Sequence, residues 1–445
     1  MLPVRAVVPA WAASVALVHC ANLIGVRDLG SEPDASVPGS VDASSSERPG
    51  DDASGRTSDM STEDSGSGQD GPHESGASDG SPSDAGGPDA TDARADSTDA
   101  SPPRDADVCD ADTRSNAAHC GTCGHSCLGG TCSNGTCQPF VVFDVAHDGL
   151  FIEDVDVDGT SAYVTLTSVN AFDRPVVSVP KDARDAFVGS SGVTTIWNAA
   201  DVPVCSVAVD DTDVYWLVPG VATRDDGAVW RAPKDGGPAV TIATAQRNPR
   251  VIALSPTDVF WGDPLNDPFE PVGIHAVAKS ATSPSARRID DTANVMHGMQ
   301  VADGKVYWSD SNGIFACDVA SCTPTLLAPV PEANFVVVGT RMFFGRFEVD
   351  TPIEVCDVAA CDSTRTTFVD HQARVLVLRA FGDDLQWIVR GTPPTFTDAK
   401  MQSCPRTGCV GAPTVHANVA YTAGMRVDAD SIWYWDSSYL RRVAR

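Results

Sequence analysis

Three ionisable residues in the second half of the chain have side chains suited to acid–base chemistry or polar ligand binding. Glu153, Arg250 and His297 each lie ten residues before an aromatic residue that begins a strand-like segment. A carboxylate, a guanidinium and an imidazole held close together can move protons or bind a polar ligand. A rim of solvated charges would show the same pattern. From residue 139 onward there is no G-x-S-x-G, H-E-x-x-H or P-loop motif, so we assign no catalytic residue.

Acidic residues at predicted turns raise the question of a metal. Carboxylate oxygens suit calcium, but Asp and Gly also form tight turns and recur in most repeats for that reason. We therefore expect turn residues, with no metal and no cofactor. The turn aspartates are Asp158, Asp210, Asp303 and Asp428.

Five tryptophans share one position in the repeats described next. A row of indole rings could form a platform for sugars, but a single repeated position is more typical of packing between repeats. We expect packing. The residues are Trp216, Trp261, Trp308, Trp387 and Trp435.

One strand motif positions all of these residues and occurs seven times. Each copy has a short alternating strand, a polar turn and a second strand that starts with an aromatic, which is typical of a two-stranded hairpin. The spacing of about 36 to 52 residues predicts one four-stranded blade of a β-propeller per copy. The copies begin at Val155 (VDVDGTSAYV), Val207, Ile252, Met299, Val336, Leu378 and Met425.

The second half of each repeat predicts a second hairpin, and in three repeats cysteines bracket its turn. VWRAPKDGGPAVTIA from Val229 aligns without a gap with IFACDVASCTPTLLA from Ile314. The cysteines replace residues that face each other across the hairpin, where Cβ atoms are close enough for a disulfide. Metal or redox chemistry is the alternative. The predicted pairs are Cys317 with Cys322, Cys356 with Cys361, and Cys404 with Cys409.

The last repeat ends after one strand of its second hairpin. The missing fourth strand resembles the segment PFVVFDVAHDG from Pro139. We infer that residues 140–146 complete the seventh blade, so that the ring has no open edge.

A cysteine-rich module of about 30 residues precedes the repeats. It has too little apolar sequence for a core and requires cross-links. Its six cysteines allow fifteen pairings, among which the sequence does not choose. Zinc is the alternative, because Cys120 and Cys123 lie near His119 and His125. Outside the module, we expect Cys205 to be a buried free thiol. The module's cysteines are Cys109, Cys120, Cys123, Cys127, Cys132 and Cys137.

The N-terminus predicts export. The apolar run from Val7 to Val18 is shorter than the roughly 20 residues that span a bilayer and follows Arg5, as in a signal peptide. Leu17-Val18-His19-Cys20 looks like a bacterial lipobox, although His19 stands where the motif has Gly or Ala. We predict lipidation of Cys20, with ordinary secretion or an uncleaved anchor as alternatives.

Composition separates the chain into four predicted parts. These are a signal peptide (residues 1–20), a disordered acidic linker (21–107), the disulfide module (108–138) and the propeller (139–445). The formal net charge is −29, and the stretch from Asp28 to Val108 holds 20 acidic but only 4 basic residues. Such a linker cannot bury enough apolar surface to fold. The lack of clustered basic residues argues against nucleic-acid binding.

The repeats resemble those of seven-bladed propellers of the YWTD, NHL and WD type. The whole chain is similar to surface lipoproteins of myxobacteria, which combine a weak lipobox, an Asp/Ser-rich stalk, a cysteine-rich module and a propeller. The resemblance implies an outer-membrane or cell-surface protein, or otherwise a periplasmic or secreted one. We expect a monomeric binding or scaffold module for a protein or glycan of the cell envelope, touching the membrane only through its lipid. The alternative is a hydrolase or lyase acting at the channel mouth.

Overall fold

The structure is a computed structural model. The predicted signal peptide, the linker, Cys20, Cys109 and His297 lie outside the residues that it describes. Those residues are 112–168, 174–199, 202–220, 225–262, 273–282, 285–290, 298–391, 398–419 and 422–445.

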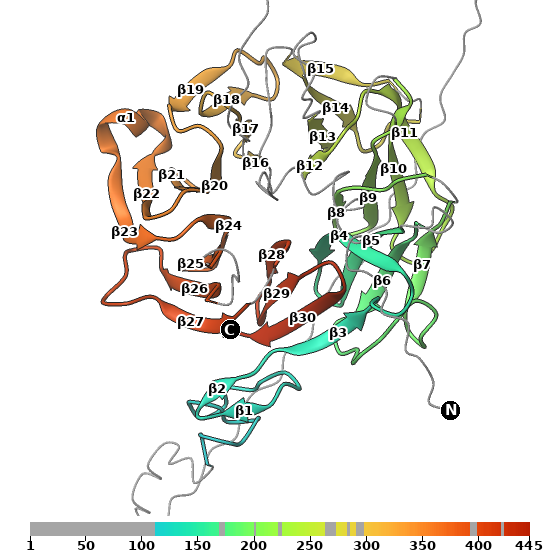
Figure 1. Ribbon diagram of the computed structural model, residues 1–445. Helices are drawn as coiled ribbons and strands as arrows, with labels where there is room; N and C mark the ends of the chain where they lie inside the picture. The colour runs from blue at the N-terminus through green and yellow to red at the C-terminus, as the bar shows by residue number, and fades with distance from the viewer. Residues whose placement is uncertain are drawn as a thin grey trace, which may run out of the picture. The chain divides into compact units, whose positions relative to one another are not determined.

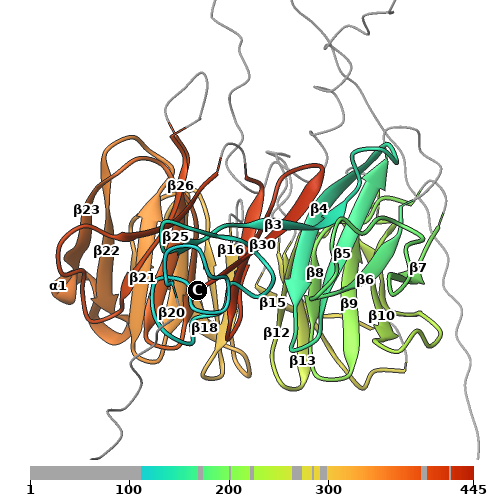
Figure 2. The ribbon, with the colours of Figure 1, turned by 90° about the horizontal axis from the view of Figure 1, so that it is seen from below.

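Seven four-stranded antiparallel sheets form a ring of seven blades, which confirms the predicted propeller (Figure 1). Each innermost strand contacts the innermost strands of both neighbouring blades. Figure 2 shows the blades edge-on, with strands running between the two faces of the ring. The first three blades, from the innermost strand outward, are β4 (Leu150–Val157), β5 (Ser161–Ser168), β6 (Val176–Pro180) and β7 (Thr194–Trp197); β8 (Val207–Val209), β9 (Asp213–Val218), β10 (Gly227–Pro233) and β11 (Val240–Gln246); and β12 (Val251–Leu254), β13 (Asp258–Gly262), β14 (Ile274–Ala278) and β15 (Arg287–Asp290).

The next three blades follow the same order. In the described ranges the only α-helix is α1 (Cys361–Thr364), which follows the 3-10 turn η3 (Val358–Ala360) in blade 5. The strands of these blades are β16 (Gly298–Ala302), β17 (Lys305–Ser309), β18 (Ile314–Asp318) and β19 (Thr325–Ala328); β20 (Ala333–Val338), β21 (Arg341–Arg346), β22 (Thr351–Asp357) and β23 (Thr366–Gln372); and β24 (Val375–Phe381), β25 (Asp384–Val389), β26 (Lys400–Pro405) and β27 (Thr414–Asn418).

Blade 7 combines strands from two distant parts of the chain. Its order is β28 (Gly424–Val427), β29 (Ser431–Trp435), β30 (Tyr439–Ala444) and β3 (Phe140–Asp144). Val141 pairs with Arg441, and Phe143 pairs with Leu440. The predicted closure by this N-terminal strand is therefore confirmed, and the fully buried Phe143 anchors it.

Three of the turn aspartates join neighbouring blades through ion pairs with lysines. The Asp158 carboxylate accepts hydrogen bonds from the backbone N–H groups of Thr160 and Ser161 and, at 2.7 Å, from Lys234 Nζ in blade 2. Burial acts to raise the pKa of Asp158, but these hydrogen bonds outweigh it and lower the pKa. Donors from the protein thus occupy the oxygens that calcium would need. The same link joins Lys279 to Asp210 and Lys181 to Asp428.

Two blades have a valine at the position of the lysine that links neighbouring blades, and in both a disulfide closes the hairpin that carries this position. Blades 4 and 5 carry Val319 and Val358 at this position. All three predicted C-x4-C disulfides are present, with Cα–Cα distances of 4.8 to 5.2 Å. They are Cys317–Cys322, Cys356–Cys361 and Cys404–Cys409.

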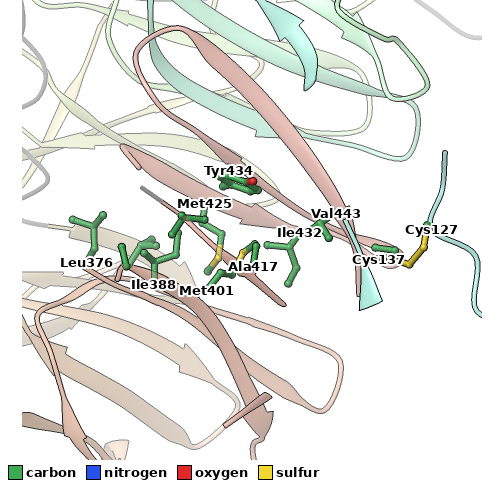
Figure 3. Packing of buried hydrophobic residues seen from close by; sticks show 14 of the residues in the cluster. Cys127, Cys137, Leu376, Ile388, Met401, Ala417, Met425, Ile432, Tyr434 and Val443 are labelled. Atoms are coloured by element: carbon green, nitrogen blue, oxygen red, sulfur yellow. A yellow bond between two sulfur atoms is a disulfide. The ribbon is translucent and has the colours of Figure 1, made fainter. Parts of the chain in front are cut away.

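Apolar side chains fill the spaces between blades. Each of the five tryptophans is at most 1% exposed and packs against residues of a neighbouring blade, as predicted. Trp435 does not share the repeat position of the other four, because in blade 7 Tyr434 occupies that position and Trp435 follows it. Figure 3 shows the corresponding cluster between blades 6 and 7, which includes Met401 and Met425 and reaches the Cys127–Cys137 disulfide.

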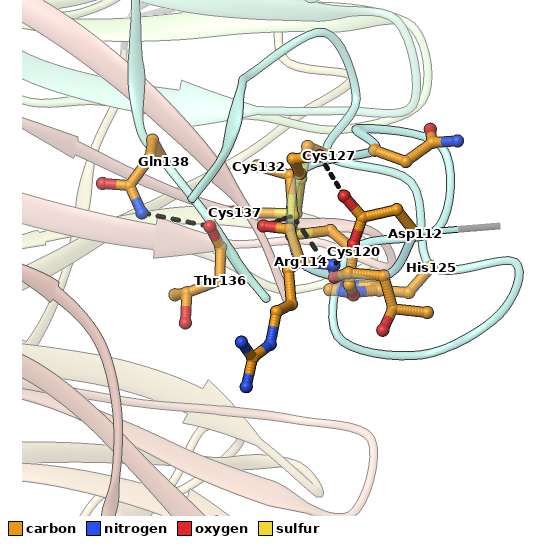
Figure 4. Close-up of a disulfide and its surroundings, with 12 residues drawn as sticks. Asp112, Arg114, Cys120, His125, Cys127, Cys132, Thr136, Cys137 and Gln138 are labelled. Atoms are coloured by element: carbon orange, nitrogen blue, oxygen red, sulfur yellow. Dashed lines mark hydrogen bonds between the residues drawn. A yellow bond between two sulfur atoms is a disulfide. The ribbon is translucent and has the colours of Figure 1, made fainter. Parts of the chain in front are cut away.

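Two disulfides hold the small module, Cys120–Cys132 and Cys127–Cys137 (Figure 4). A short hairpin of β1 (Cys132–Ser133) and β2 (Thr136–Cys137) lies between them. Cys123 is also disulfide-bonded. The sulfurs required for the zinc alternative are therefore used in cross-links. His125 Nε2 lies 2.6 Å from the carbonyl oxygen of Arg445, so the module contacts blade 7.

The disulfides indicate an oxidising compartment, outside the cell or in the periplasm. Within the described ranges, no helix has the length and apolar character required to cross a membrane.

Candidate functional site

A cavity of about 190 Å³ lies at the centre of the ring, where the innermost strands begin. The repeat alignment places seven residues ten or eleven positions before the repeat aromatics, and five of them line this cavity. The exceptions are Ala333, which is buried in an apolar cluster, and His297, which the structure does not describe. The five are Glu153, Cys205, Arg250, Leu376 and Ala423.

A β-bulge places Glu153 at the cavity. Ile152 pairs with Leu166 and Asp154 pairs with Thr165, so Glu153 has no partner across the sheet. An extra residue of this kind bends its strand and redirects its side chain. The aligned residue of blade 6, Leu376, is likewise skipped in the pairing of β24 with β25.

Glu153 makes no hydrogen bond or ion pair with any residue that the structure describes. Burial raises the pKa of its carboxyl from the usual 4.5 to about 7. Arg250 and Arg174 act to lower this pKa, and Asp154 acts to raise it further. At neutral pH, Glu153 therefore exchanges readily between its charged and neutral forms.

Arg250 shares the cavity with Glu153 without pairing to it. Its Nε donates to Asn248 Oδ1 at 2.9 Å, and no ion pair joins it to another described residue. Burial lowers the pKa of Arg250, while Glu153 acts to raise it. The structure thus brings together two of the three residues of the predicted ligand face.

Cys205 corrects the expectation of a free thiol. It is buried and lines the cavity, but it is disulfide-bonded. The expectation was wrong because counting spacings paired only close cysteines, and a lone cysteine then appears unpaired. A bonded sulfur is neither a nucleophile nor a metal ligand.

The sequence analysis missed an ion-pair cluster on one side of the cavity. Arg426 of blade 7 donates to Asp154 at 3.1 Å and to Asp156 at 3.3 Å, both in blade 1. The same two carboxylates accept hydrogen bonds from the backbone N–H groups of Val207 and Val209 in blade 2. The cluster therefore joins three blades, and its carboxylates are already occupied.

Other polar side chains of the innermost strands contact the next blade in the same way. Gln300 both donates to the carbonyl oxygen and accepts from the N–H of Val337, each at 2.8 Å. Asn334 donates to the carbonyl oxygen of Val375 at 3.0 Å, and Ser206 donates to that of Arg250. These links hold the backbone around the cavity in one arrangement, which favours a preformed binding site.

Arg379 of blade 6 is the exception among these side chains. It occupies the repeat position of Gln300 and Arg426 and lines the cavity, but it donates a 2.8 Å hydrogen bond from Nη1 to the carbonyl oxygen of Leu378 beside it and not to the next blade. Burial lowers the pKa of Arg379 to about 9, and the neighbouring Arg426 contributes. It therefore remains a cation at neutral pH. The signal in the sequence was a charged residue at a position that is Ala or Val in three other repeats.

Comparison with known proteins adds no function. No protein-family model and no curated protein matches the chain. Among solved structures, the WD40 β-propeller domain of Doa1 is 11% identical with a TM-score of 0.49, covering 69% of this chain and 97% of that one. The computationally designed Ika8 protein is 9% identical (TM-score 0.43; coverage 69% and 100%). A prolyl endopeptidase is 10% identical (TM-score 0.45; coverage 64% of this chain and 46% of that chain).

Proposed function

We propose that this chain is an exported binding or scaffold module that presents its channel cavity to a protein or glycan of the cell envelope. The observation that carries this proposal is a rigid ring whose central cavity contains charged groups, Glu153 and Arg250, that no described residue pairs. Partly buried polar groups with unused hydrogen-bonding atoms favour a ligand that supplies the missing contacts.

Tethering is a further part of the proposal. The lipobox-like segment ending at Cys20, the acidic Ser- and Asp-rich stretch after it and the resemblance to myxobacterial surface lipoproteins support attachment through a lipid. Mass spectrometry of the mature N-terminus tests this. A diacylated Cys20 would establish the anchor, whereas an N-terminus elsewhere with unmodified residues would remove it.

One observation favours a second candidate function, a hydrolase or lyase. A carboxyl group whose pKa is about 7 can both give and take a proton at neutral pH, as a general acid or base must. In that case Glu153 would contact the substrate directly, with Arg250 binding negative charge on it.

The test uses the purified full chain and a panel of glycan and peptide fragments prepared from cell envelopes. Binding is measured by calorimetry, and each bound fragment is recovered and analysed by mass spectrometry. A fragment that binds and is recovered unchanged supports the binding module, whereas a converted fragment supports the enzyme.

A matched pair of variants locates the binding. Glu153→Ala with Arg250→Ala changes the cavity, while Glu348→Ala with Arg346→Ala removes a 3.7 Å ion pair elsewhere, in which Glu348 is 65% exposed. Binding should weaken in the first variant only. Equal binding by both variants would show that the cavity is not the site.

A further inference from the structure

Two arginines in the cavity have hydrogen-bond donors without acceptors. A guanidinium carries five N–H donors. Arg379 uses one donor on its own strand and Arg250 uses one on Asn248, with no further acceptor among the described residues. Their charge and their geometry are therefore available to a ligand.

The nearby carboxylates do not supply the missing acceptors. Asp154 and Asp156 act on Arg379 through space, but their hydrogen bonds go to Arg426 and to backbone N–H groups of blade 2. Glu153 makes no ion pair with either arginine. Cations that are partly removed from water and have no hydrogen-bonded counterion favour an anion that accepts their hydrogen bonds.

The local charge also contrasts with the rest of the molecule. The chain has 60 acidic and 31 basic residues. The cavity lining reverses this ratio, with three arginines against Glu153 and Asp154. The cavity lining is therefore locally cationic, which favours an anionic group of a ligand.

We infer that the cavity binds the anionic group of its ligand, a carboxylate or a phosphate, through the guanidinium groups of Arg379 and Arg250. Planar guanidinium groups bind both oxyanions with two parallel hydrogen bonds. Gly424, which lines the cavity, has no side chain where one would collide with the ring of Trp435, another lining residue. This inference rests on the proposed binding function and specifies its ligand.

The experiment measures the thermal stabilisation of the full chain by inorganic phosphate and by glucuronate, with glucose as the uncharged comparison. About 150 mM sodium chloride screens exposed charges. At least one anion should raise the melting temperature and glucose should not. A rise in melting temperature with phosphate alone would identify a phosphate site, and a rise with glucuronate alone would identify a carboxylate site.

Arg379→Gln should weaken anion binding about 10- to 100-fold, the loss expected for hydrogen bonds to a charged group. Arg346→Gln, outside the cavity, should leave it unchanged. Without anions, Arg379→Gln should melt no lower than the parent chain. Arg426→Gln should melt at a lower temperature, because it leaves the carboxylates of Asp154 and Asp156 without their guanidinium partner.

Two results would overturn the inference. One is the absence of stabilisation by either anion, and the other is equal anion affinity in the Arg379→Gln and Arg346→Gln variants. Uncharged envelope fragments that bind in the cavity would then leave the proposed binding function in place with a different ligand.

Discussion

Replacing Glu153 with glutamine should stabilise the folded chain at alkaline pH. The pKa of Glu153 is about 7 in the folded chain, against 4.5 for an exposed glutamate, because burial disfavours the carboxylate. The folded chain therefore holds the proton more tightly than the unfolded chain does. This contribution to stability is complete below pH 4.5 and is lost as the pH rises through 7. Glutamine has the same shape and carries no charge to desolvate.

The size of the effect follows from the two pKa values. One pH unit between them corresponds to about 1.4 kcal/mol, so the rise to about 7 corresponds to about 3 kcal/mol in the free energy of unfolding. For a domain of this size that is a shift in melting temperature of about 5 °C. The charges that act on Glu153 are those of Arg250, Arg174 and Asp154.

The assay is calorimetric melting of the parent chain and the Glu153→Gln variant between pH 4.5 and pH 8.5. The difference in melting temperature should grow through this window and level off above pH 8. Glu348→Gln, at a 65% exposed position, is the control and should show no such growth. A pH-independent difference for Glu153→Gln would refute the reasoning, because the carboxyl would then titrate alike in both states.

Three further substitutions test the ring. Phe143→Ala in the closing strand should lower the free energy of unfolding by about 4 kcal/mol, and an unchanged urea midpoint would contradict the closure. Asp158→Asn should cost about 2 kcal/mol at pH 7 through the lost bond to Lys234. Because the folded-state pKa is depressed below the usual 3.8, this cost should begin to shrink only as the pH falls below 3.8 and should be smaller at pH 2 than at pH 7. An equal cost at pH 2 and pH 7 would argue against the ion pair. Replacing Cys317 and Cys322 with serine should lower the free energy of unfolding by about 2 kcal/mol, measured by guanidinium unfolding under oxidising conditions. An unchanged free energy of unfolding would show that this short disulfide loop does not restrict the unfolded chain.

The repeat architecture could be predicted from sequence because each blade contains its own turn and aromatic residue. The closure could be predicted because the last repeat lacked a fourth strand, while the strand-like segment at Phe140 belonged to no other repeat. The C-x4-C pairs followed from positions that face each other in a hairpin. Pairings in the small module could not be predicted, because loops without strand register allow all of them.

The cavity was predicted only in part. The repeat alignment predicted that Glu153 and Arg250 lie near each other, because each occupies the same place at the innermost strand of its blade, and both line the cavity. Arg379 was missed because the bulge at Leu376 changes which side chains of that alternating strand point inward. Arg426 lies on the regular strand β28 and was missed because its partners, Asp154 and Asp156, lie about 270 residues away in the sequence. A bulge depends on how a strand pairs with its neighbour, so the alternation of polar and apolar residues in that strand alone does not predict it.

The pairing of β3 with β30 also determines when blade 7 can form during synthesis of the chain. Val141 pairs with Arg441, which the ribosome adds 300 residues later. Blades 1 to 6 are built from contiguous hairpins and can form as they emerge, whereas β3 must wait for almost the entire propeller to be made. Closing so long a loop costs little more free energy than closing a shorter one, since the cost grows with the logarithm of its length. The first and last strands can therefore pair only after synthesis of the ring is complete.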